Sequence, residues 1–96
     1  MMKSREMNYE LIRVRLIETY EEYNNPQTQK AAVIKMKEIA KEYEDVLDLL
    51  DDTLNCAIGI MDAITKGQIK DKKEEASLIK EILTELKAKS YLGGGE

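Results

Sequence analysis

Histidine, tryptophan and phenylalanine are absent from this chain of 96 residues, and Cys56 is its only cysteine. Because histidine is missing, zinc sites of the usual kind, catalytic triads and general-base histidines are excluded. A single cysteine cannot form an intramolecular disulfide bond, which is consistent with a reducing compartment. With no histidine to activate its thiol, we interpret Cys56 as a buried packing residue. The composition therefore disfavours most classes of enzyme.

Long apolar runs and export signals are missing as well. The longest apolar stretch, residues 56–61, contains Gly59 and is far shorter than the roughly 20 residues that a membrane-spanning helix needs. The segment from Met1 to Glu6 lacks the apolar core of a signal peptide. The net charge of −4 disfavours nucleic acid as a partner. We therefore expect a cytoplasmic protein with no membrane and no nucleic-acid partner.

The most informative pattern is a heptad repeat along the middle of the chain. Its positions follow alternating spacings of four and three residues: Ala32, Met36, Ile39, Tyr43, Val46, Leu50, Thr53, Ala57, Ile60 and Ile64. This repeat predicts one long helix over residues 26–65, with Pro26 in its first turn and Gly67 just after its end. Further apolar residues beside the repeat make the apolar face wider than a two-stranded coiled coil needs. The long helix therefore requires several neighbouring helices.

Two shorter helices flank the long one. Apolar residues at helical spacing predict a helix over residues 4–23, and a capping-box pattern that begins at Asp71 starts a helix over residues 71–92. Residues 93–96 are rich in glycine, and we expect them to form a flexible tail. We predict an all-α single domain over residues 1–92, in which three helices form antiparallel hairpins. A break of the long helix in its second half, between positions 51 and 59, is the main structural alternative.

Self-association follows from the width of the apolar face. Two short helices leave part of the long helix uncovered, so we expect a homodimer, or another homo-oligomer, that completes a helical bundle. The first helix also has an apolar side that a single hairpin cannot bury. The predicted interface is Met7, Leu11, Val14, Leu47, Leu50, Leu54, Ala57 and Met61.

These features favour a small, non-enzymatic helical protein–protein interaction module. It would act as an adaptor, regulator or inhibitor of a larger protein, would self-associate through its long helix and would use no cofactor. The identity of the protein partner and the choice among these roles are not encoded in any pattern of the sequence.

One carboxylate pattern gives an alternative function. Glu18-Thr-Tyr-Glu21, followed by Glu42-Tyr-Glu-Asp45, resembles the paired ExxE and ExxD motifs of the MazG-like all-α nucleoside triphosphate pyrophosphohydrolases. The resemblance covers residues 18–45 only. It implies that these four carboxylates, Glu18, Glu21, Glu42 and Asp45, hold magnesium for the cleavage of a triphosphate.

A further alternative is an acidic mimic of DNA. A line of carboxylates could compete with DNA for a basic site on another protein, and such a complex would weaken steeply with salt. The residues of this line are Glu42, Glu44, Asp45, Asp48, Asp51 and Asp52.

Overall fold

The computed structural model describes residues 2–42, 44 and 51–94, with side chains from residue 9 to residue 89 within those ranges. The described residues form four helices and no strand, which confirms the all-α class. The helices are α1 (Met2–Tyr23), α2 (Gln29–Glu42), α3 (Asp51–Thr65) and α4 (Lys72–Gly94).

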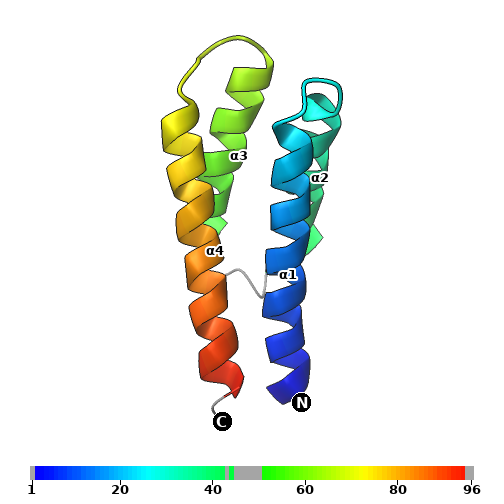
Figure 1. Ribbon diagram of the computed structural model, residues 1–96, viewed down its shortest axis with the longest axis vertical. Helices are drawn as coiled ribbons and strands as arrows, with labels where there is room; N and C mark the ends of the chain where they lie inside the picture. The colour runs from blue at the N-terminus through cyan, green and yellow to red at the C-terminus, as the bar shows by residue number, and fades with distance from the viewer. Residues whose placement is uncertain (1, 43, 45–50, 95–96) are drawn as a thin grey trace.

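The four helices form an antiparallel bundle that measures 45 × 20 × 19 Å (Figure 1). Each helix packs against two others: α1 contacts α2 and α4, and α3 contacts α2 and α4. With 22 and 23 residues, α1 and α4 are much longer than α2 and α3, which have 14 and 15. At the end of the bundle where both chain termini lie, α1 and α4 therefore continue side by side past the shorter pair (Figure 1).

The prediction of three helices is wrong, because no single helix spans residues 26–65. One helix ends at Glu42 and the next begins at Asp51, and the two pack side by side. The heptad repeat did not reveal this break, because two antiparallel helices on a common core bury the same heptad positions as one long helix. The alternative break between positions 51 and 59 is also misplaced, since α3 continues through Gly59.

The predicted ends of two helices are confirmed in their hydrogen bonds. Asp71 caps α4, because its Oδ1 accepts hydrogen bonds from the backbone N–H groups of Lys73 and Glu74 at 3.1 and 3.2 Å. After α3, Gly67 has a positive φ of 75°. The Gly67 N–H donates to the Ile64 carbonyl, and the next N–H donates to the carbonyl one residue before Ile64, a Schellman motif that requires glycine at this position.

The core lies along the axis of the bundle, and all four helices contribute to it. Its largest apolar side chains with almost no solvent exposure are Ile12, Leu16, Tyr23, Met36, Ile39, Leu54, Met61, Ile82 and Leu86. The apolar face of α3 that we expected a second copy to cover, with Leu54, Ala57 and Met61, is thus covered by the chain itself. That expectation depended on one continuous long helix, so it is corrected together with the break. The other two residues predicted for this interface, Leu47 and Leu50, lie outside the described residues.

None of the described helices is both long enough and apolar enough to cross a bilayer. The longest ones, α1 and α4, carry charged side chains along most of their length. This finding agrees with the short apolar runs of the sequence.

We predict that Leu54→Ala lowers the free energy of unfolding by about 2–5 kcal/mol, because it leaves a cavity in the core of the single chain. Urea denaturation measures this change, and sedimentation velocity measures the oligomeric state, which we expect to stay the same. Ile34→Ala is the matched control, since Ile34 is 58% exposed, and its effect should stay within about 0.5 kcal/mol. A change of oligomeric state at unchanged stability would show that Leu54 belongs to an interface.

Candidate functional site

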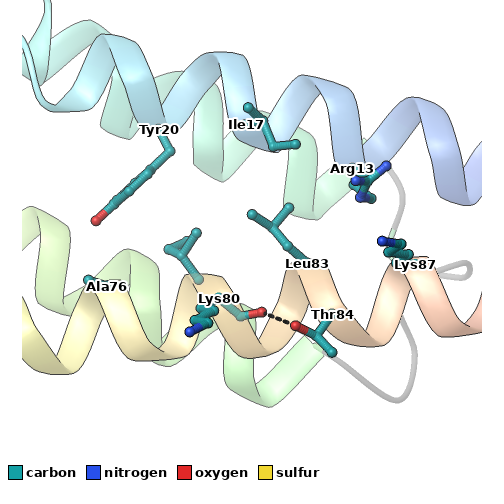
Figure 2. Close-up of a pocket in the computed structure, with 9 residues that line it drawn as sticks. Arg13, Ile17, Tyr20, Ala76, Lys80, Leu83, Thr84 and Lys87 are labelled. Atoms are coloured by element: carbon teal, nitrogen blue, oxygen red, sulfur yellow. Dashed lines mark hydrogen bonds between the residues drawn. The ribbon is translucent and has the colours of Figure 1, made fainter.

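An open groove runs along the contact between α1 and α4 (Figure 2). Its volume is about 290 Å³, and Ile17 and Leu83 point toward one another across it. Arg13 and Lys87 lie at one end of the groove, and Tyr20 lies at the other (Figure 2). The complete lining is Arg13, Ile17, Tyr20, Ala76, Ile79, Lys80, Leu83, Thr84 and Lys87. The middle of this α1/α4 groove is therefore apolar, and one of its ends is basic.

Lysines give the α4 wall of the groove its positive charge. Lys80 and Lys87 are exposed, and neither forms an ion pair with another described residue. Between them, the Thr84 hydroxyl donates a hydrogen bond to the Lys80 carbonyl oxygen at 2.8 Å (Figure 2). On the α1 wall, Arg13 Nη1 binds Glu10 Oε1 at 2.8 Å, so its charge is partly compensated. The uncompensated positive charge of the groove thus lies on α4.

A buried polar cluster lies beside the Tyr20 end of the groove. The Tyr20 hydroxyl donates to Glu75 Oε1 at 3.2 Å, and the Tyr20 ring stacks on Tyr23 with the ring centroids 5.9 Å apart. Glu75 is only 1% exposed. Its Oε2 and the Tyr23 hydroxyl have no hydrogen-bond partner among the described residues. A carboxylate in this position is costly, because burial removes its hydration and one oxygen gains no replacement bond.

Burial shifts the pKa values of this cluster. Desolvation raises the pKa of Glu75, although the Tyr20 hydrogen bond and the positive charge of Lys72 oppose the shift. Desolvation, with the neighbouring Glu75 charge and Tyr20, raises the pKa of Tyr23 to about 12. The same burial, the Glu75 charge and the hydrogen bond to Glu75 raise the pKa of Tyr20. The tyrosines are therefore neutral hydroxyls at physiological pH, and Glu75 is the member of the cluster whose pKa burial raises above that of an ordinary carboxyl group.

Glu75 is not among the residues predicted from the sequence, although its spacing carries a signal. The spacing from Glu75 to Ile79, Ile82 and Leu86 is four, three and four residues, so Glu75 belongs to the buried stripe of α4. Its position at the end of a run of six charged residues, 70–75, hid this periodicity.

The carboxylates of the MazG-like pattern are spread over two neighbouring helices. Arg15 Nη1 binds Glu42 Oε2 at 3.3 Å, which places the end of α2 level with Arg15 on α1. At 1.5 Å per residue, Glu18 and Glu21 lie about 4.5 and about 9 Å from that level along the axis. Asp45 lies outside the described residues. Among the described residues, no three carboxylate or cysteine side chains gather closely enough to hold a metal ion.

The residues predicted for an interface differ in how exposed they are in the structure. Leu11 is 49% exposed and Val14 is 40% exposed on the outer surface of α1. Leu54, Ala57 and Met61 are buried in the core, as described above. The side chain of Met7 is outside the described part of the chain.

Cys56 and the predicted acidic line are the remaining features singled out in the sequence. Cys56 is exposed, which corrects its interpretation as a buried packing residue. It lies between Leu54 and Ala57, whose burial turns this position of α3 outward. In the predicted acidic line, Glu42, Glu44 and Asp52 are exposed and Asp51 is half-buried, whereas Asp45 and Asp48 lie outside the described residues.

Comparison with known proteins gives no family for this chain. No family model matches its sequence, and no curated protein or solved structure matches it either. The features of the described residues that bear on function are the groove, the buried polar cluster and the exposed apolar side chains.

We predict that Glu75→Gln raises the free energy of unfolding at pH 7 by about 1 kcal/mol, because the amide avoids the cost of a buried charge with an unpaired oxygen. The folded state raises the pKa of Glu75, so it holds this proton more tightly than the unfolded chain does. The contribution of protonated Glu75 to the free energy of unfolding is therefore fully present below the ordinary pKa of 4.5. It is lost as the pH rises through the pKa of Glu75 in the folded state. The advantage of the variant should therefore shrink toward pH 4.

Urea denaturation between pH 4 and pH 8 measures this effect. Glu74→Gln is the matched control, because it removes the same charge from the same helix turn at an exposed position. A Gln variant that is less stable than the parent protein at pH 7 would contradict the assignment of a buried, costly carboxylate.

Proposed function

We propose that this protein is a small, non-enzymatic helical interaction module that serves as an adaptor, regulator or inhibitor of a larger protein. The observation that carries the proposal is the exposure of Leu11 and Val14 on the outer surface of α1. The bundle does not need these side chains for its core, because Ile12 and Leu16 supply the buried side of the same helix turns. Exposed apolar side chains that lie together on a small protein are typical of a contact surface.

The apolar surface continues from α1 into the groove. Leu11 and Val14 are three residues apart, and so are Val14 and Ile17, which makes them successive neighbours on the helix surface. Ile17 lines the α1/α4 groove opposite Leu83. We call the surface formed by Leu11, Val14, Ile17 and Leu83 the α1/α4 face. A partner that binds there can contact a surface wider than one helix.

The register of the helices supports this choice of surface. Because Glu42 at the end of α2 is level with Arg15, the turns of α1 that carry Leu11 and Val14 extend past α2. Among the described helices, only α4 packs against α1 in that region. Among the described helices, the turns of α1 that carry Leu11 and Val14 therefore have only α4 beside them, whereas Ile17 and Leu83 lie where all four helices pack together.

We predict that Leu11→Glu abolishes binding to the partner and leaves the helical content unchanged. The variant places a charge in an apolar contact surface, but Leu11 contributes no buried side chain to the core. Affinity capture with the tagged protein from a native cell extract, followed by mass spectrometry, shows whether a near-stoichiometric partner is lost, and circular dichroism reports the fold.

Ile34→Glu is the matched control, because Ile34 is equally apolar and 58% exposed but lies on α2. We expect this variant to retain the partner. Unfolding of Leu11→Glu would instead assign Leu11 to the core, and equal loss of the partner in both variants would assign binding to another surface.

The MazG-like alternative has one supporting observation. The ion pair between Arg15 and Glu42 sets a register in which Glu18 and Glu42, from adjacent helices, differ by about one helical turn in level. The same ion pair weighs against the alternative, because Arg15 holds the Glu42 carboxylate that would have to bind magnesium. The acidic mimic of DNA stays a third proposal, with its exposed carboxylates near the facing ends of α2 and α3.

A magnesium-dependent assay for the release of pyrophosphate from nucleoside triphosphates separates the first two proposals. The interaction module should give no turnover. The enzyme should give turnover that Glu18→Gln and Glu42→Gln each abolish and that Glu38→Gln retains, since Glu38 is an exposed carboxylate of the same hairpin outside the motif.

A further inference from the structure

We propose that the α1/α4 groove binds an amphipathic helix of a partner protein, and that acidic side chains flank the apolar seam of this helix on one side only. The acidic flank lies along the lysines of α4, and the other flank lies along α1. This inference rests on the proposed function, because it names the chemistry of the partner for the part of the α1/α4 face that lies in the groove.

The α4 wall of the groove has the pattern of one side of a helix–helix contact. Ala76 and Leu83 line the groove and are seven residues apart. Four residues after each of them a lysine follows, Lys80 and Lys87, and both lysines also line the groove. An exposed lysine one heptad earlier, Lys73, continues this row. We call the three lysines the lysine row. They stand at the e positions of a heptad whose a positions line the groove, and charged side chains at e positions pair across a helix contact.

The positive charge of the lysine row is not compensated within the described part of the chain. None of its three ammonium groups forms an ion pair or a hydrogen bond with another described residue. At one end of the groove Lys87 lies beside Arg13, whose own charge is only partly compensated by Glu10 (Figure 2). A partner helix with an acidic side chain every seven residues would meet this charge at each heptad.

The α1 wall carries no such row of lysines. The residues at its outer edge are Val14, three residues before Ile17, and Glu21, four residues after it, and both are exposed. Ile17 lies opposite Leu83 and the two helices are antiparallel, so Glu21 is about level with Lys80 across the groove (Figure 2). A helix in the groove therefore meets lysines on its α4 side, and an apolar and an acidic side chain on its α1 side. This difference is the reason why we expect only one flank of the partner to be acidic.

The shape of the groove favours a helix over a small molecule. Its volume of about 290 Å³ is at the lower end of the roughly 300–1,000 Å³ of small-molecule pockets, and it is open to solvent. From Ala76 to Lys87 it extends about 17 Å along α4, or three helical turns. All residues that line it come from α1 and α4, so a helix on this side does not meet α2 or α3. Two antiparallel helices present a depression of this kind, into which the ridge of a third helix packs.

Three labelled synthetic helices test the groove on the purified protein. Each has three heptads, with leucine at the two seam positions, alanine at one flank and glutamine elsewhere. At the other flank the first probe carries glutamate, the second glutamine and the third lysine. Fluorescence anisotropy measures their binding at about 50 mM salt, where surface charges are weakly screened, and each probe is used at a concentration at which it is monomeric.

Two charge-reversal variants locate the binding. The groove variant carries Lys80→Glu and Lys87→Glu. The matched control carries Lys30→Glu and Lys41→Glu, which reverse two exposed lysines of α2 outside the groove. All four positions are exposed, so both variants should fold, and circular dichroism checks this.

We expect the unchanged protein to bind the glutamate probe at least about tenfold more tightly than the lysine probe, with the glutamine probe between them. This preference should decrease as the salt concentration rises, because the charges are exposed. The groove variant should bind the glutamate probe at least about tenfold more weakly than the parent does and should prefer the lysine probe instead. The control variant should bind the glutamate probe like the parent.

Four outcomes would overturn the inference. The first is a glutamate probe that does not bind at protein concentrations up to about 1 mM, which corresponds to about −4 kcal/mol. The second is equal binding of the three probes, and the third is equal loss of the glutamate probe in the groove and control variants. The fourth is displacement of that probe by an oligothymidylate at a lower concentration than by the unlabelled peptide, since the lysine row would then be a site for phosphates.

The proposed function fails separately, when affinity capture finds no partner that depends on Leu11. This residue does not line the groove, so Leu11→Glu leaves the lysine row and the apolar seam unchanged. A captured partner that depends on Leu11, together with probes that do not bind, would refute the acidic helix in the groove alone.

Discussion

The packing of α1 against α4 determines the rest of this structure. These two helices are the farthest apart in the sequence, so their contact closes the bundle and joins the hairpin of α1 and α2 to the hairpin of α3 and α4. Both are long, and they continue past the shorter helices at the end where the termini lie (Figure 1). The groove and the buried polar cluster both lie along this contact. A change in the register of α1 against α4 would therefore alter both of these features.

The hydrogen bond from Tyr20 to Glu75 is the polar part of this contact. It joins α1 to the first turn of α4, and it is the one hydrogen bond between the two helices in the described part of the chain. A buried carboxylate adds little to stability, because its desolvation offsets most of what the bond contributes. It does restrict the register, since a slip by one turn would leave both the carboxylate and the Tyr20 hydroxyl without this partner. We interpret the cluster as the contact that fixes the register of the α1/α2 hairpin against the α3/α4 hairpin.

Sequence patterns predicted the features that depend on local chemistry. The end of α1 at Tyr23, the Asp71 cap and the turn at Gly67 follow from residues that act within a few positions of one another. The predicted end of the last helix at residue 92 is wrong, because α4 continues to Gly94, into the segment expected to be a flexible tail. The break between α2 and α3 could not be predicted from the heptad repeat, because the repeat reports which side of a helix is buried and not where the chain reverses. The burial of Leu54 and the groove beside Lys80 depend on that reversal, so they were missed with it. The exposure of Leu11 agrees with the prediction because the first helix alone has apolar residues on two sides.

The unequal lengths of the helices explain why apolar side chains are exposed at one end of this bundle. Where four helices lie together, each apolar stripe meets two neighbours, and the core is closed by the chain itself. Past the level of Arg15 and Glu42, α1 has only α4 beside it among the described helices, and two helices cannot bury the apolar sides of both. A further helix packed at that end would give the N-terminal turns of α1 the second neighbouring helix that they lack. Among the described helices, the short α2 and α3 thus leave one end of α1 and α4 uncovered, and the apolar side chains exposed there are the surface that we propose for binding a partner.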